Sequence, residues 1–162
     1  MPDNFLMRYS VYIMMSVIGV TLLFFTFFQF MMKEPTLPFS FKHRAHEKTI
    51  YVNGTPVRAH LLATEADRVK GLSGKTNIGY NEGMLFVFDT SDEWGIWMKD
   101  MNFAIDVLWI AEDGTIVGLV EEMQPESYPQ VYMSSVPAKY VLELHAGFAD
   151  SFNVALGQKV DL

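Results

Sequence analysis

Two charged residues in apolar surroundings, Lys99 and Asp106, are the residues of this sequence best placed to do chemistry. Asp106 lies between Ile105 and Val107, and an unpaired buried carboxylate is costly. It must therefore accept hydrogen bonds, meet a cation or line a polar cavity. Lys99 lies seven residues earlier and could reach back across a turn. The simplest expectation is structural: Asp106 pairs with Lys99, or accepts backbone N–H groups, and fixes the local fold.

The same charges could instead serve a ligand. In this interpretation Lys99 binds an anionic group, Asp106 orients or activates the bound molecule, and the three tryptophans form apolar walls. Such a mixture of apolar walls and a few convergent polar groups is typical of ligand pockets. The candidate ligand-binding residues are Met84, Trp97, Lys99, Asp106 and Ser134, the last in the loop Tyr128 to Ser135.

Paired carboxylates would support a different chemistry. Glu82 stands at the start of one apolar run and Glu143 lies within another. Either of them, together with Asp106, could provide the acid and base of a glycoside hydrolase. Each glutamate is more simply interpreted as a solvent-facing strand residue or a partner of Arg68. Catalytic residues are therefore left unassigned, and whether the protein is an enzyme stays open.

The sequence gives little support to a metal or cofactor. It contains no cysteine, which excludes disulfides, a thiolate zinc site and a cysteine nucleophile. Thioethers with His145 could hold Cu(I), a soft ion, but methionine more often fills gaps in a core. The methionines concerned are Met84, Met98, Met101, Met123 and Met133. We expect no metal and no cofactor.

The first part of the chain has the pattern of a membrane anchor. Residues 11–32 carry no charge, and about 20 helical residues cross the hydrocarbon of a bilayer. The run ends in Gln29, Phe30, Met31 and Met32, which lack the small residues of a signal-peptidase site. We therefore expect an uncleaved transmembrane helix at 11–32, preceded by a tail (1–10) and followed by a linker (33–47).

Charge bears on membrane orientation and on partners. Lys33, Lys42, Arg44 and Lys48 follow the span and only Arg8 precedes it, which favours a cytoplasmic domain, but long domains cross largely regardless of charge. We expect the domain on the extracytoplasmic side. Residues 1–33 carry a net charge of +1, so residues 34–162 carry −8. An acidic domain without a basic cluster repels phosphate backbones, so nucleic-acid binding is not expected.

Residues 48–162 have the pattern of a mainly β domain. Asn53-Gly54 and Asp113-Gly114 are hairpin signals. Thr64 with Asp67 resembles a capping box that opens a short helix ending at Gly71. We expect strands near 49–52, 57–61, 84–88, 94–98, 103–111, 115–123, 140–145 and 158–162, a second short helix at 148–152, and an irregular stretch at 124–138. Seven or eight short strands with one or two short helices predict a small β-sandwich or barrel.

Several blocks of this domain resemble a known family. They are Arg68 with Gly71-Leu72, EGMLFVF at Glu82 to Phe88, WMK at Trp97 to Lys99, Asp106, Gly114, and PAKYVLEL at Pro137 to Leu144 followed by Gly147. In order and spacing they resemble domain of unknown function 192, also called uncharacterised protein family 0127. The resemblance implies a jelly-roll-like, mostly β domain, often behind a signal peptide or N-terminal anchor. Ser73, Lys75 and Asp100-Met101 depart from residues that the family often has, so a pocket built on those positions would differ in chemistry.

Together these observations predict a single-pass membrane protein whose β domain is a non-enzymatic binding module for a small molecule, an envelope polymer or a partner protein. The alternative is an envelope hydrolase or carbohydrate-active enzyme using Asp106 with Glu82 or Glu143. A scaffold that recruits a membrane complex is a third possibility. The positions of the carboxyl groups in the folded domain distinguish these possibilities. Two carboxylates facing one open cleft would favour the enzyme, whereas a buried and fully hydrogen-bonded Asp106 would favour binding or structure.

Overall fold

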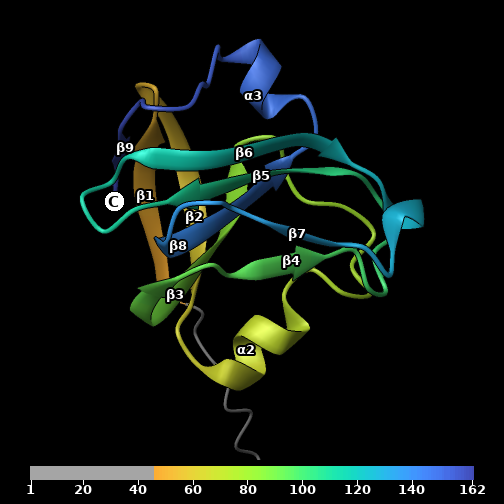
Figure 1. Cartoon of the computed structure of the whole chain (residues 1–162). Helices are drawn as coiled ribbons and strands as arrows, with labels where there is room; N and C mark the ends of the chain where they lie inside the picture. Colours follow the sequence, from red (N-terminus) through yellow and green to blue (C-terminus); the bar gives the residue numbers. More distant parts are fainter. Residues whose placement is uncertain (1–45) are drawn as a thin grey trace, which may run out of the picture. The chain divides into compact units, whose positions relative to one another are not determined.

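The computed structural model describes residues 46–162, which form a mainly β domain (Figure 1). In chain order the elements are β1 (His46–Val52), β2 (Thr55–Leu62), α2 (Glu65–Lys70), β3 (Glu82–Asp92), β4 (Gly95–Trp97), β5 (Ile105–Ile110), β6 (Ile116–Met123), the 3₁₀ helix η1 (Pro125–Ser127), β7 (Val131–Met133), β8 (Ala138–His145), α3 (Phe148–Ser151) and β9 (Val160–Asp161). The prediction of a mainly β domain with one or two short α-helices is confirmed.

The expected transmembrane helix at 11–32, the tail before it and most of the linker lie outside the described residues. Between residues 46 and 162, none of the helices has the length and apolar character needed to cross a bilayer. β1 begins at His46, two residues before the expected start of the domain at Lys48.

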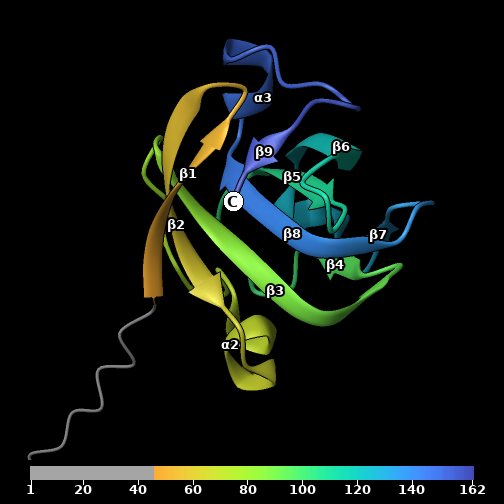
Figure 2. The ribbon, with the colours of Figure 1, turned by 90° about the vertical axis from the view of Figure 1, so that its left-hand side faces the viewer.

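Seven strands form one sheet in the order β6-β5-β8-β3-β2-β1-β9. All neighbours are antiparallel except β2 and β3, which run parallel. The sheet curls into a half-barrel, with α2 and α3 at opposite ends (Figures 1 and 2). Its two edges meet at one end, where Ile116 N donates to Gln158 O and Val160 N to Gly114 O, both at 2.9 Å. The strands thus do not divide into the two comparable sheets of a jelly roll, and the fold is closer to the expected barrel.

Local signals explain several boundaries. Asn53 (φ 46°) and Gly54 (φ 77°) form the tight turn between β1 and β2, as the sequence predicts, because both residues tolerate positive φ. The Thr64 Oγ1 accepts from Asp67 N at 3.2 Å and caps α2. Gly71 (φ 43°) ends α2 by donating its N–H to Asp67 O.

Two further features differ from the sequence prediction. β3 continues to Asp92 through residues expected to be a loop. After an irregularity beyond Val87 the exposed strand pairs with β8 again, at Asp92 and Ala138. The stretch expected to be irregular, 124–138, contains η1 and β7. β7 pairs antiparallel with β4 as a separate two-stranded sheet. The β-prone residues of β7 are only three, and prolines on both sides hide them from a pattern search.

Both faces of the central strands are buried, as predicted for 84–88 and 103–111. One core contains Leu85, Leu108, Ile110, Leu142 and Leu144 with residues of α3. The alternate residues of the same strands belong to a second core, with Met84, Phe86, Val107, Trp109 and Val141. Side chains alternate between the faces of a strand, so one strand supplies both cores. Glu143 pairs in register with Met84 and Val107 and therefore lies on the face of the second core.

Candidate functional site

Asp106 has a structural role. It is fully buried, and its two oxygens accept three backbone N–H groups. The Oδ1 accepts from Glu122 N at 2.8 Å and Gly147 N at 3.2 Å, and the Oδ2 accepts from Ala149 N at 2.8 Å. These bonds join β5 to β6 and to the start of α3. Of the two structural alternatives, backbone hydrogen bonding is the one observed, and Lys99 is not the partner.

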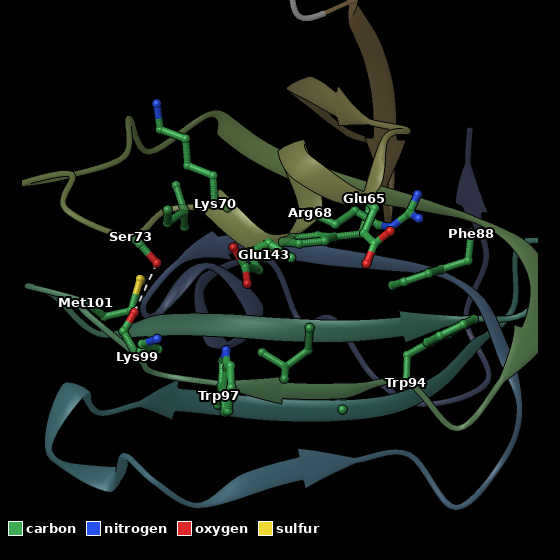
Figure 3. Close-up of a pocket in the computed structure, with 16 residues that line it drawn as sticks. Glu65, Arg68, Lys70, Ser73, Phe88, Trp94, Trp97, Lys99, Met101 and Glu143 are labelled. Atoms are coloured by element: carbon green, nitrogen blue, oxygen red, sulfur yellow. Dashed lines mark hydrogen bonds between the residues drawn. The ribbon is translucent and has the colours of Figure 1, made fainter.

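A pocket of about 430 Å³ lies beside α2, against β3, β4 and β8 (Figure 3). Its buried surface is formed by Leu72, Phe86, Ile96 and Glu143. Exposed residues surround its opening, namely Glu65, Val69, Lys70, Gly95, Trp97 and Lys99. Arg68, Gly71, Ser73, Phe88, Trp94 and Met101 complete the lining. Figure 3 shows the Glu143 carboxyl between the residues of α2 and those of β4.

Glu143 is the most unusual group in this pocket. Its side chain comes from the middle of β8, and the residue is 6% exposed. Its Oε2 is buried and lacks a hydrogen-bond partner among residues 46–162. Burial raises the pKa of Glu143 from its ordinary 4.5 to about 8, because a charge is poorly solvated there. At neutral pH the side chain is therefore mostly a neutral carboxylic acid, able to donate a hydrogen bond as well as accept one.

Trp94 provides a second buried polar atom without a partner within the described part of the chain, its Nε1. The indole ring is firmly held. It stacks on Phe88 with ring centroids 4.0 Å apart and planes 8° apart, and its backbone carbonyl accepts from Trp109 Nε1 at 2.7 Å. The Arg68 guanidinium lies 5.1 Å from the Phe88 centroid and donates to Val87 O at 2.9 Å. Contacts within the protein thus hold the aromatic wall in place without a ligand.

The opening of the pocket is rich in cations. Arg68 and Lys70 come from α2, Lys99 from the segment after β4, and Glu65 is the anion that accompanies them in the lining. The Lys99 Nζ lies 5.9 Å from the centroid of the Trp97 ring. Its backbone is held by Ser73, whose Oγ donates to Lys99 O at 3.0 Å. With Glu143 neutral, the charged residues of the lining are three cations and one anion.

The sequence-predicted residues separate into two groups. Trp97 and Lys99 line the pocket with Glu143. The simpler interpretation of Glu143 as a solvent-facing strand residue is wrong, because the residue is buried. Met84 is buried in the second core. Ser134 is buried against β6, where its Oγ donates to Val117 O at 3.3 Å and accepts from Val136 N at 3.2 Å.

Glu82 also lies outside the lining of the pocket. It forms an ion pair with Arg58 on β2 and accepts from Gly79 N at 3.2 Å. Its partner is therefore Arg58 rather than the expected Arg68. Neither Asp106 nor Glu82 faces the pocket with Glu143.

The contribution of α2 was missed by the sequence interpretation, although a signal was present. Glu65, Arg68 and Val69 follow the i, i+3, i+4 spacing of one face of α2, and all three line the pocket. A short helix with this spacing and a mixture of charged and apolar residues indicates a face turned toward a partly open cavity.

Three of the five methionines of the β domain are packed in the core. Met84, Met98 and Met123 are buried, Met101 lines the pocket and Met133 is exposed. Between residues 46 and 162 no three side chains of His, Asp or Glu lie together as a metal site would require.

Comparison with known proteins identifies the family. The model of domain of unknown function 192 (DUF192), described as uncharacterized ACR, matches residues 48–162. The chain belongs to the DUF192 family. A search of curated proteins found no match.

Two crystal structures are similar to this DUF192 domain. One, from Sinorhizobium meliloti 1021, is provisionally named a transcription regulator; it is 29% identical with a TM-score of 0.65, and the match covers 70% of this chain and 89% of that one. The other, from Novosphingobium aromaticivorans DSM 12444, is a protein of unknown function; it is 26% identical with a TM-score of 0.67, covering 72% of this chain and 85% of that one.

Proposed function

We propose that this DUF192 domain is a non-enzymatic binding module that holds a small molecule in the pocket beside α2. The observation that carries the proposal is Glu143. A buried polar group without a hydrogen bond costs about 1–3 kcal/mol. Glu143 reaches a cavity open to solvent, and its Oε2 is without a partner in the described residues. A ligand with a hydrogen-bonding group at that depth would recover this free energy on binding.

The rest of the pocket supports the proposal. Its volume, about 430 Å³, falls within the roughly 300–1,000 Å³ of small-molecule sites. Its walls are mainly aromatic and aliphatic, with a few polar groups converging from different elements. The wall formed by Phe88 and Trp94 is fixed in advance by stacking and by the hydrogen bond from Trp109. A fixed wall lowers the entropic cost of binding.

The membrane anchor is part of the same proposal. The uncharged run at 11–32 supports a single-pass helix, and a linker of about 15 residues would keep the domain close to the bilayer. We place the domain on the extracytoplasmic side. Reporters fused after Leu162 test this placement, because activity of a reporter that works only in the cytoplasm would contradict it.

Nucleic acid is not proposed as the ligand. The name of the Sinorhizobium protein concerns transcription, but residues 34–162 of this chain carry a net charge of −8. Binding to a phosphate backbone depends on a basic surface that releases counterions.

A carbohydrate-active enzyme is the second candidate, and one observation favours it. Two carboxyl groups, Glu143 and Glu65, line the same pocket. Burial raises the pKa of Glu143 to about 8, as in a general acid, while Glu65 is exposed on α2. The earlier pairing of Glu143 with Asp106 is not retained, because both oxygens of Asp106 are used by backbone N–H groups.

A ligand screen with matched variants tests the proposal. The full chain is screened against metabolites and glycans by thermal shift, and each ligand found is tested on Glu143→Ala and on Glu121→Ala. Glu121 is an exposed glutamate of β6 outside the pocket lining, so it controls for loss of a carboxyl group. A shift that disappears only in Glu143→Ala supports the binding module. Shifts that persist equally in both variants would contradict it, and turnover of a glycan lost in Glu143→Gln would favour the enzyme.

A further inference from the structure

The polar groups of the pocket share one property at neutral pH: nearly all offer protons rather than lone pairs. On the buried side these are the Trp94 N–H and, since burial keeps its pKa near 8, the Glu143 carboxyl. At the opening they are the exposed side chains of Lys70 and Lys99, whereas the partly buried Arg68 already donates to Ala63 O and Val87 O. Donors and cations on a binding surface are complementary to acceptors and anions on a ligand.

The donors are arranged in two zones of different exposure. Glu143 is 6% exposed and the Trp94 Nε1 is buried, so a charged ligand group placed there would lose its hydration. Lys70 and Lys99 are exposed, so an anion beside them would keep much of its water. A neutral acceptor such as a carbonyl oxygen is therefore suited to the buried zone, and the negative charge is suited to the opening.

Apolar surface joins the two zones. Leu72, Phe86 and Ile96 are buried in the lining, and Trp97 stands at the opening with its ring close to the Lys99 ammonium. A flat or aliphatic ligand body between them would remove apolar surface from water on both sides. Cations are disfavoured at the same place, because the lining carries three positive side chains and Glu65 is the anion beside them.

We propose that the pocket binds a small organic anion, an apolar or aromatic acid whose body carries a hydrogen-bond acceptor next to Glu143 and whose charged group lies at the opening, where Lys70 and Lys99 are exposed. This inference rests on the proposed binding function and names its ligand class. It also explains why a domain with a strong negative charge gathers cations around one opening.

A matched series of four compounds tests charge and acceptor separately. 4-Oxo-4-phenylbutanoate has the ring, the carbonyl and the carboxylate. Its amide lacks the charge, 4-phenylbutanoate lacks the carbonyl, and the corresponding primary amine reverses the charge. Affinities are measured on the full chain in nanodiscs of zwitterionic lipid by quenching of Trp94 and Trp97, both of which line the pocket.

The keto acid is expected to bind best. Loss of a neutral hydrogen bond corresponds to about three- to tenfold, so 4-phenylbutanoate should bind weaker by that factor. Combining Lys70→Ala with Lys99→Ala should weaken the acid about three- to tenfold and leave the amide unchanged, because each partly solvated charge pair is worth less than a buried one. Lys48→Ala removes an exposed lysine of β1 and should change neither affinity. Added salt should weaken the acid alone.

The outcomes distinguish this inference from the proposed function. Equal binding of acid, amide and amine, unchanged by the double lysine variant, would overturn the anion inference while leaving a binding pocket. Preference for the amine would overturn it as well. If none of the four compounds binds while the metabolite screen yields ligands that depend on Glu143, the anion class is wrong and the binding function stands. If that screen is also empty, both fail.

Discussion

Replacing Glu143 with glutamine should remove a large pH dependence of stability. Burial raises the pKa of Glu143 in the folded protein to about 8, above its ordinary 4.5. Between these two pH values the unfolded chain has lost the proton and the folded protein keeps it. Unfolding then releases a proton, so stability falls as the pH rises from about 4.5 to about 8.

The magnitude follows from the shift. One pKa unit corresponds to about 1.4 kcal/mol, so a rise from 4.5 to about 8 costs the folded protein on the order of 5 kcal/mol at alkaline pH. Between pH 5.5 and 7.5 the wild type should lose about 2–3 kcal/mol through this group alone. Glu143→Gln keeps the size of the side chain and cannot ionise. It should therefore be more stable than the wild type at pH 7.5 and similar to it at pH 5.

Urea unfolding, monitored by tryptophan fluorescence, measures the pH dependence of stability in the full chain. All three tryptophans lie within residues 46–162, so the signal reports the β domain. The relevant quantity is the difference in stability between wild type and variant at each pH, because all other groups contribute equally to both. Glu121→Gln, at an exposed position, should run parallel to the wild type.

Equal pH slopes for wild type and Glu143→Gln would refute the reasoning. Glu143 would then be ionised in the folded protein at neutral pH, and it could not act as the buried donor on which the choice of ligand depends.

Three further substitutions test the structure. Asp106→Asn should destabilise the domain by about 3 kcal/mol, because the carboxylate accepts three backbone N–H groups and the amide nitrogen of asparagine cannot accept a hydrogen bond. Urea midpoints at neutral pH measure this loss of stability, and an unchanged midpoint would contradict the role of Asp106. Thr64→Ala should cost about 1 kcal/mol by removing the cap of α2, and it should lower thermal stability without changing the core. Gly83→Ala should cost about 1–3 kcal/mol, since its Cβ would lie 2.9 Å from Leu142 Cδ1; unaltered stability would mean that the strands separate easily.

Much of the fold follows from local chemistry. Asn53-Gly54 and Thr64 with Asp67 act over two to four residues, so their structural effects can be predicted without knowing the rest of the chain. The burial of both faces of the central strands was also predictable, because runs such as Met84 to Phe88 have no polar member. β7 was not, since it is short, lies between prolines and exists by pairing with β4.

The site depends on distant contacts and was less predictable. The need of Asp106 for hydrogen bonds was evident, but its partners are 16, 41 and 43 residues away in sequence. Lys99, seven residues away, was the wrong partner. Closeness in sequence does not determine the direction in which two side chains point in a curled sheet. The pocket likewise joins α2 to Glu143, residues separated by most of the domain.

The meeting of the two sheet edges has a consequence for recognition. An exposed strand edge offers unpaired N–H and C=O groups and can accept a strand from another chain, either a peptide ligand or an aggregating copy. Here Gly114 and Ile116 hydrogen-bond with Val160 and Gln158, so the two edges occupy each other at that end. At the next residue of β6, the Ser134 hydroxyl donates to Val117 O. Strand addition is therefore blocked along this part of the sheet edge, which protects the domain against edge-to-edge association. Recognition there must proceed through side chains rather than through the backbone.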